Sequence, residues 1–130
     1  MQILSLNGPW KLYYGAETPG KENPETLEDA ILADYEAVDA VVPCEAQRAL
    51  VDAGKWPDPF WNENIYKFRK LEFYRFFFTR TFEYAPVSEP GRVVLHFDGL
   101  DVLATVFVND QIVGTADNML VSHAFDVTGV

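Results

Sequence analysis

Short runs in which hydrophobic and polar residues alternate fill most of the chain, and this period of two is typical of β-strands with one buried face. The strongest run is residues 74–84, which is dense in aromatic and β-branched side chains. It predicts a strand with Phe76, Phe78 and Phe82 on one face. Further strands are expected at residues 10–14, 36–43, 92–99, 102–108, 111–116 and 122–129.

Turn residues separate these runs. Asn7 and Gly8 predict a turn before the first strand. Asn109 and Asp110 both tolerate a left-handed backbone, so they predict a two-residue hairpin turn between 102–108 and 111–116.

Two short helices are expected between the early strands. Asn23 and Pro24 are well suited to be the N-cap and first residue of a surface helix, along which Leu27, Ile31 and Tyr35 recur at helical spacing. A second helix is expected within the segment 46–54, AQRALVDAG, whose last residue Gly54 lies just past the helix end.

Closely spaced strands and turns predict an all-β protein, a β-sandwich, as one domain over residues 1–130. The hydrophobic content of 48% is enough for a core. The strands fall short of the about eight that a jelly roll needs, so we expect a fold that is cut short.

The net negative charge of the chain limits the classes of partner that it could bind. A net charge of −10 repels nucleic acid and anionic membranes, so we expect a neutral or cationic partner, with no nucleic acid and no membrane. The N-terminus has no signal-peptide pattern, and no segment is apolar enough to span a bilayer. The chain is therefore expected to be soluble and cytoplasmic.

Candidate chemistry is sparse, and no cofactor is expected. Cys44 is the single cysteine and is expected to be a buried or semi-buried structural thiol. His96 and His123 lack the spacing of zinc ligands, and a calcium site using Asp98 or Asp101 stays open.

Catalysis within the chain is not expected. Nucleophile-elbow and phosphate-loop motifs are absent from the sequence. Asp58, Glu63 and Glu72 are close in sequence, yet nothing singles out two of them as the carboxylate pair of a glycosidase.

The segment 56–64, WPDPFWNEN, is the strongest candidate for a binding site. Its two prolines exclude an ordinary helix or central strand, which predicts a stiff loop. Aromatic faces beside amides and carboxylates suit a sugar. The candidate residues are Trp61, Asn62, Asn64, Asp58, Trp56 and Phe60. The alternative is a loop whose aromatic rings only seal an interface.

Several segments, in order, resemble the N-terminal domain of family 2 glycoside hydrolases. LNGPWKL is similar to the opening L-N-G-x-W, and VVPCEAQRAL to a V-P-G-x-x-x-x-x-L segment. WPDPFWNEN resembles the I-P-D-P-F-Y-x-x-N loop of the β-mannosidase branch. FFFTRTFEY and the run from Leu95 to Gly129 match the strands that follow.

The match covers most of the chain except the polar stretch 16–34, and it has departures. Cys44 stands where the family has glycine, Asp110 replaces the usual hairpin glycine, and Leu120 replaces a phenylalanine. Phe76 and Phe77 stand where the β-mannosidase branch often has tryptophan.

The resemblance implies a galactose-binding-like jelly roll, non-catalytic in itself, that precedes a (β/α)₈ barrel carrying the two catalytic glutamates. The implied partners are that downstream barrel and a neutral glycan such as a β-mannoside. Apart from the resemblance, a structural domain with an exposed sheet edge would have a second copy as partner, in a homo-oligomer. The loop matching WPDPFWNEN would approach the mouth of the barrel, which makes Trp61, Asn62 and Asn64, supported by Asp58, the expected substrate-proximal groups.

Two alternatives remain open for the whole chain, an independent carbohydrate-binding module and a purely structural domain. Asp117 and Asn118 have two interpretations as well. They could supply turn chemistry between strands, or lie at a domain interface or the edge of a pocket.

Overall fold

The computed structural model describes residues 3–18, 20, 22–55, 74–84, 92–100, 103–117 and 122–129. They form two compact units, Met1–Glu83 and Tyr84–Val130. A single domain over 1–130 stays a prediction. The described part contains seven strands and two short helices, in agreement with the expected all-β class. None of its helices could span a bilayer.

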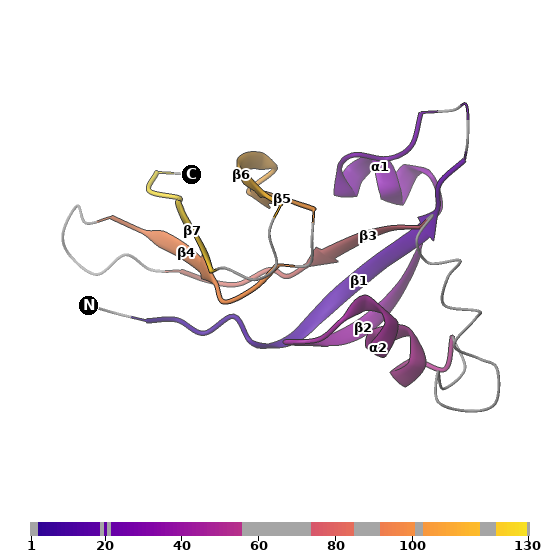
Figure 1. The fold of residues 1–130 in the computed structure, drawn as a ribbon, viewed down its shortest axis with the longest axis horizontal. Coiled ribbons are helices and arrows are strands. Elements are labelled where there is room, and N and C mark those ends of the chain that lie inside the picture. Colours follow the sequence, from indigo (N-terminus) through magenta and orange to yellow (C-terminus); the bar gives the residue numbers. More distant parts are fainter. Residues whose placement is uncertain are drawn as a thin grey trace. The chain divides into compact units, whose positions relative to one another are not determined.

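The first unit is built on a three-stranded antiparallel sheet in the order β2-β1-β3 (Figure 1). β1 spans Gly8–Ala16, β2 spans Glu36–Val42 and β3 spans Tyr74–Thr79. Leu12 lies opposite Val38 on one side and Phe78 on the other, which fixes the register of both pairings. The central strand is therefore hydrogen-bonded along both edges.

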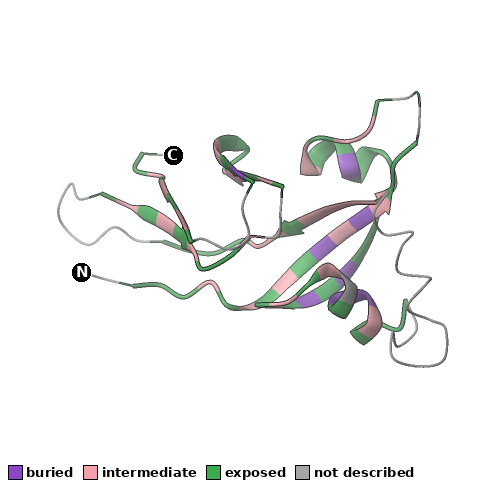
Figure 2. Cartoon of the chain, viewed as in Figure 1, coloured by how far each residue is buried: buried purple, intermediate pink, exposed green. Residues whose placement is uncertain are grey.

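The core of this unit lies on one face of the sheet. Alternation along β1 and β2 turns Leu12, Val38 and Ala40 to the same side, where they are buried (Figure 2). Helix α2, Ala46–Asp52, covers this face with Ala49 and Leu50. The cluster stabilises the unit by removing apolar surface from water.

Helix α2 ends as expected. Gly54 has a φ of 74°, and its N–H donates to the carbonyl of Val51 while the N–H of Lys55 donates to that of Leu50 at 2.9 Å. This pair of bonds is a Schellman motif, which requires a left-handed residue that glycine adopts without strain. Lys55 therefore leaves the helix in a fixed direction.

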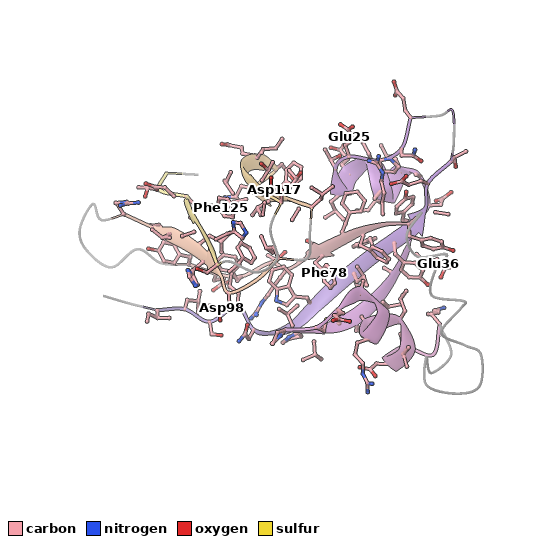
Figure 3. All side chains as sticks on the ribbon, viewed as in Figure 1. Glu25, Glu36, Phe78, Asp98, Asp117 and Phe125 are labelled. Atoms are coloured by element: carbon pink, nitrogen blue, oxygen red, sulfur yellow. The ribbon has the colours of Figure 1, made fainter. Side chains whose placement is uncertain are left out.

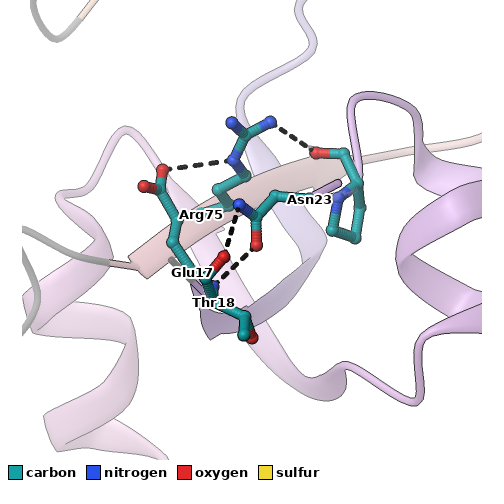
Figure 4. A network of polar contacts seen from close by, with 5 residues as sticks. Glu17, Thr18, Asn23 and Arg75 are labelled. Carbon is teal, nitrogen blue, oxygen red and sulfur yellow. Dashed lines mark hydrogen bonds and ion pairs between the residues drawn. The ribbon is translucent and has the colours of Figure 1, made fainter. Parts of the chain in front are cut away.

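The expected start of the first helix is wrong. Helix α1 spans Leu27–Leu32, and its N-cap is Thr26, whose hydroxyl accepts from the N–H of Asp29 at 3.1 Å. Asn23 instead accepts from the N–H of Thr18 at 2.8 Å, closing the loop before the helix (Figure 4). A nearby backbone donor outside the helix competed successfully for the asparagine side chain.

The second face of the sheet is covered by Tyr35, which lies just beyond α1 rather than inside it as the helical spacing predicted. A Cβ added to Gly15 would lie 2.5 Å from the Tyr35 ring, so the ring rests directly on the glycine backbone. The ring also meets Phe77 edge-on, with centroids 6.1 Å apart. Gly15 is thus a glycine at which a side chain, the Tyr35 ring, packs closely against the strand backbone.

An arginine ties the loop before α1 to β3. The guanidinium of Arg75 donates to the carboxylate of Glu17 at 3.1 Å and to the carbonyl of Pro24 at 2.8 Å (Figure 4). The two bonds hold both ends of the polar stretch 17–24 against one strand. Alternation along the strand places Arg75 on the face opposite Phe76, but it does not predict these partners.

The predicted strand at 74–84 is shorter in the structure. β3 stops at Thr79, and Arg80 donates instead to the carbonyl of Leu6 at 2.7 Å. Phe82 lies beyond the strand and is 43% exposed, so it does not share a buried strand face with Phe76. The predicted strand was too long because aromatic residues continue beyond Thr79, whereas pairing with β1 ends where Lys11 lies opposite Thr79.

The second unit contains two antiparallel ladders. β4, Val94–Phe97, pairs with β7, His123–Asp126, and β5, Ala104–Val108, pairs with β6, Gln111–Ala116. The expected hairpin turn is confirmed, since Asn109 and Asp110 have φ angles of 50° and 64°.

One aromatic ring links these two ladders. The Phe125 ring occupies the space that a Cβ on Gly114 would need, and it meets Phe97 edge-on at 6.2 Å. Val93, Leu95 and Phe97 are each partly buried, while Val94 and His96 between them are exposed, as the alternation predicted.

Gly15→Ala is expected to destabilise the chain by about 1–3 kcal/mol, because the new methyl group would have to displace the Tyr35 ring. Urea denaturation followed by circular dichroism would measure this loss. In a Tyr35→Ala background the same substitution should cost less than half as much. An equal cost in both backgrounds would show that the ring does not impose the glycine.

Candidate functional site

Nearly all the residues predicted to approach a ligand lie outside the described residues. This holds for Trp56, Asp58, Phe60, Trp61, Asn62 and Asn64, and for Asn118. Asp117 is described and is the exposed residue directly after β6 (Figure 3). The assignment of these side chains to a site stays a prediction.

The described residues that border the segment 56–73 form a cluster at one end of the first sheet. Residue Tyr14, near the end of β1, faces Glu36, the first residue of β2, in the strand register. The Tyr14 hydroxyl donates to the Glu36 carboxylate at 2.6 Å. Figure 3 shows Glu36 at this end of the sheet.

Two further side chains complete the cluster. The ammonium group of Lys55 lies 4.0 Å from the same Glu36 oxygen that accepts from Tyr14. The ring of Tyr74 stacks on that of Tyr14, with centroids 6.4 Å apart and an interplanar angle of 18°. We call these four residues, Tyr14, Glu36, Lys55 and Tyr74, the sheet-end cluster.

The cluster has the properties of a structural support. Burial of Tyr14, together with its bond to the Glu36 carboxylate, raises the pKa of the phenol well above its usual range. The hydroxyl therefore keeps its proton and serves as a fixed donor. The pair of Lys55 and Glu36 is half exposed and adds only about 0–1 kcal/mol, so the Tyr14 bond carries more of the stability.

A shallow depression of about 320 Å³ lies beside the cluster, with tyrosine rings and carboxylates in its wall. The rings are those of Tyr14, Tyr35 and Tyr74, and the carboxylates are those of Asp34 and Glu36. Such a surface could contact a polar ligand through ring faces and hydroxyl-binding oxygens. One Glu36 oxygen, Oε2, already accepts from Tyr14 and lies near Lys55.

The residues considered for metals are dispersed. His96 bonds to Asp98 at 3.0 Å on an exposed part of the second unit, as expected for a histidine on a sheet surface. Asp101 lies outside the described residues. Within the described ranges no three His, Cys, Asp or Glu side chains gather as metal ligands would.

Cys44 is half-buried against the apolar cluster of the first unit, and burial raises the pKa of its thiol. This half-buried position against the core agrees with the expected structural thiol.

The sequence alone does not predict the sheet-end cluster. Tyr14 is expected in one strand and Glu36 at the start of another, but their pairing depends on the register between β1 and β2. The one hint in the sequence is that Lys55 and Tyr74 lie on either side of the segment 56–73.

The open antiparallel sheets and two short helices define a strand-rich, galactose-binding-like domain. A model of the glycosyl hydrolase 2 galactose-binding domain-like family matches residues 20–130. The chain belongs to this family. The resemblance drawn from the sequence motifs is thereby confirmed.

Curated relatives of the chain are named β-mannosidases, which agrees with the branch that the sequence motifs resemble. The chain is 34% identical over 68% of its length to the β-mannosidase B of Thermothelomyces thermophilus. It is 32% identical over 70% of its length to the β-mannosidase of Mus musculus. It spans about 10% of the length of each of these proteins.

A solved structure gives the same result. The crystal structure of β-D-mannosidase from Dictyoglomus thermophilum matches 99% of the chain with a TM-score of 0.76 at 25% identity. The chain covers 14% of that protein. The predicted galactose-binding-like fold is confirmed by this match.

Tyr14→Phe is expected to reduce the loss of folding stability that occurs as the pH rises into the alkaline range. The pKa of Tyr14 is raised on folding, so its contribution to stability is complete below the unfolded value of about 10 and is lost as pH rises through the folded value. The free energy of unfolding at pH 8 to 11 should therefore fall less steeply for Tyr14→Phe than for the wild type.

Tyr13→Phe is the matched control, since the neighbouring Tyr13 points to the other face of β1. It should keep the wild-type slope. Equal slopes for wild type and Tyr14→Phe would contradict the assignment of a raised pKa to Tyr14.

Proposed function

We propose that the chain is the non-catalytic N-terminal domain of a larger glycoside hydrolase that cleaves β-mannosides. The observation that carries the proposal is the family match over residues 20–130, together with curated relatives named β-mannosidase of which the chain spans about a tenth. The remainder of the polypeptide would supply the barrel and the two catalytic glutamates that the family resemblance implies.

Within this proposal the segment 56–64 contributes to the rim of the active-site pocket. Trp61 would stack on the apolar face of a pyranose, while Asn62 and Asn64, helped by Asp58, would bond its hydroxyls. Trp56 and Phe60 would pack at the interface with the barrel. In this proposal the segment therefore has two roles: Trp61 and its polar neighbours contact the sugar, while Trp56 and Phe60 seal the interface.

The described residues offer few groups that are ready to react, which agrees with a supporting domain. The Tyr14 hydroxyl is hydrogen-bonded to the Glu36 carboxylate, and the pKa of the Cys44 thiol is raised, which favours its protonated form. A domain of this kind acts by binding and positioning, and the reaction takes place on residues of its partner.

The full-length protein should hydrolyse aryl β-mannosides, preferring them to aryl β-galactosides, and residues 1–130 alone should hydrolyse neither. Trp61→Ala in the full-length protein should raise KM about tenfold, the loss of one aromatic stacking contact, with kcat little changed. Trp61→Phe keeps an aromatic face and should stay close to the wild type. Steady-state kinetics on both glycosides measures these effects.

Two results would count against the proposal. Full-length protein without β-mannosidase activity would remove the assigned substrate. Saturable binding of manno-oligosaccharides by residues 1–130 alone, measured by calorimetry and lost in Trp61→Ala, would favour an independent carbohydrate-binding module.

A further inference from the structure

The depression of about 320 Å³ at the end of the first sheet is lined by aromatic and acidic residues. The aromatic residues are Tyr14, Tyr35 and Tyr74, and the acidic ones are Asp34 and Glu36. None of the described residues that line it carries a positive charge. A larger depression of about 530 Å³ beside β2 differs, because lysines and aspartates both line it and its described lining contains no aromatic residue. The smaller depression therefore has the side-chain composition of a site for a cation.

The tyrosines of this depression are held by contacts with the rest of the unit. The Tyr35 ring rests on the backbone of Gly15 and meets Phe77 edge-on at 6.1 Å, and its hydroxyl oxygen is buried. Tyr14 is only 6% exposed and stacks on Tyr74. Tyr35 and Tyr74 are half-buried, so they provide most of the accessible aromatic surface. Because the rings are already packed, little side-chain freedom remains to be lost when a ligand binds.

The carboxylates favour a positively charged ligand over a neutral one. An ionised carboxylate only accepts hydrogen bonds, and the hydroxyl of Tyr14 is already used as a donor to Oε2 of Glu36 at 2.6 Å. Within the described part of the chain, the Asp34 carboxylate has no hydrogen bond or ion pair. Its negative charge is therefore not balanced by a described neighbour, and a cation would gain more from it than a sugar would.

Asp34 also occupies a backbone position at which glycine would be more stable. The N–H of Asp34 donates to the carbonyl of Ile31 at 3.1 Å, and the N–H of Tyr35 donates to that of Ala30 at 3.0 Å. Helix α1 thus ends in the same Schellman motif as α2, but its left-handed residue is Asp34, with a φ of 59°, instead of a glycine such as Gly54. Aspartate adopts this conformation most easily when its side chain bonds locally, and no such bond is formed here. Backbone stability therefore does not explain the aspartate.

We propose that this depression binds a small organic cation, whose alkylated ammonium group lies against Tyr35 and Tyr74 and near the carboxylates of Asp34 and Glu36. The electron-rich ring faces attract the cation, and the carboxylates add a Coulombic attraction. A depression of about 320 Å³ is at the small end of ligand sites, which suits a molecule of the size of choline. All the side chains of the site belong to described residues, and the inference does not rest on the proposed function.

The test is a titration of the full-length protein with choline, followed by saturation-transfer NMR on the choline methyl protons. We expect saturable binding with a Kd of about 1 mM, because the depression is shallow. The neutral isostere 3,3-dimethylbutan-1-ol has the shape of choline without its charge and should bind about fivefold more weakly. Tighter binding of N-acetyl-trimethyllysine amide than of choline would identify a protein side chain as the source of the cation, and the reverse order a free small molecule.

Variants of Asp34 distinguish a binding role from a structural one. Asp34→Gly should weaken choline binding about threefold and should unfold at a higher urea concentration than the wild type, because glycine relieves the left-handed backbone. A purely structural residue would not show weaker binding together with higher stability. Asp34→Asn removes the charge at nearly constant size and should weaken binding to the same extent. Tyr74→Leu should also weaken it about threefold, through the loss of a ring face.

Asp39→Asn is the matched control, since it removes one carboxylate from the larger depression and leaves the smaller one intact. Its Kd for choline should equal that of the wild type. The proposal is overturned if the wild type shows no saturable binding, if the neutral isostere binds as tightly as choline, or if the Asp34 and Tyr74 variants keep the wild-type Kd. The titration contains no glycoside, so its result is independent of whether the full-length protein hydrolyses β-mannosides.

Discussion

The register of β1 between its two neighbours is the constraint on which the first unit depends. The side chains of this strand alternate between the two faces of the sheet, so a shift by one residue would exchange the faces. Leu12 would leave the apolar cluster, and Gly15 would no longer lie beneath the Tyr35 ring. Because Cβ-bearing residues cannot occupy that position without moving the ring, the glycine specifies the register as firmly as the leucine does.

The same register produces the sheet-end cluster. It sets Tyr14 opposite Glu36 and beside the strand that begins with Tyr74, so a core residue also becomes the fixed donor at the sheet end. The helix cap at Gly54 then directs Lys55 to the same carboxylate. Tyr14 therefore belongs both to the apolar core and to the polar contacts at the sheet end, so a substitution of this residue affects both.

The chain spans about a tenth of the length of its curated β-mannosidase relatives. Among its described residues, the guanidinium of Arg75 is engaged with the carboxylate of Glu17. Under the proposed function, a net charge of −10 is compatible with a neutral glycan as ligand.

The sequence by itself determined the strand-rich class, the hairpin at Asn109 and Asp110, the cap at Gly54 and the family, because these follow from local periodicity, backbone preference and ordered motifs. Only the tertiary structure decided that Thr26 replaces Asn23 as the helix cap and that β3 ends at Thr79. It alone brought Tyr14, Glu36, Lys55 and Tyr74 together. The physical reason is that caps, strand ends and cross-strand contacts depend on competing partners and on register, and both are set by residues far apart in the chain.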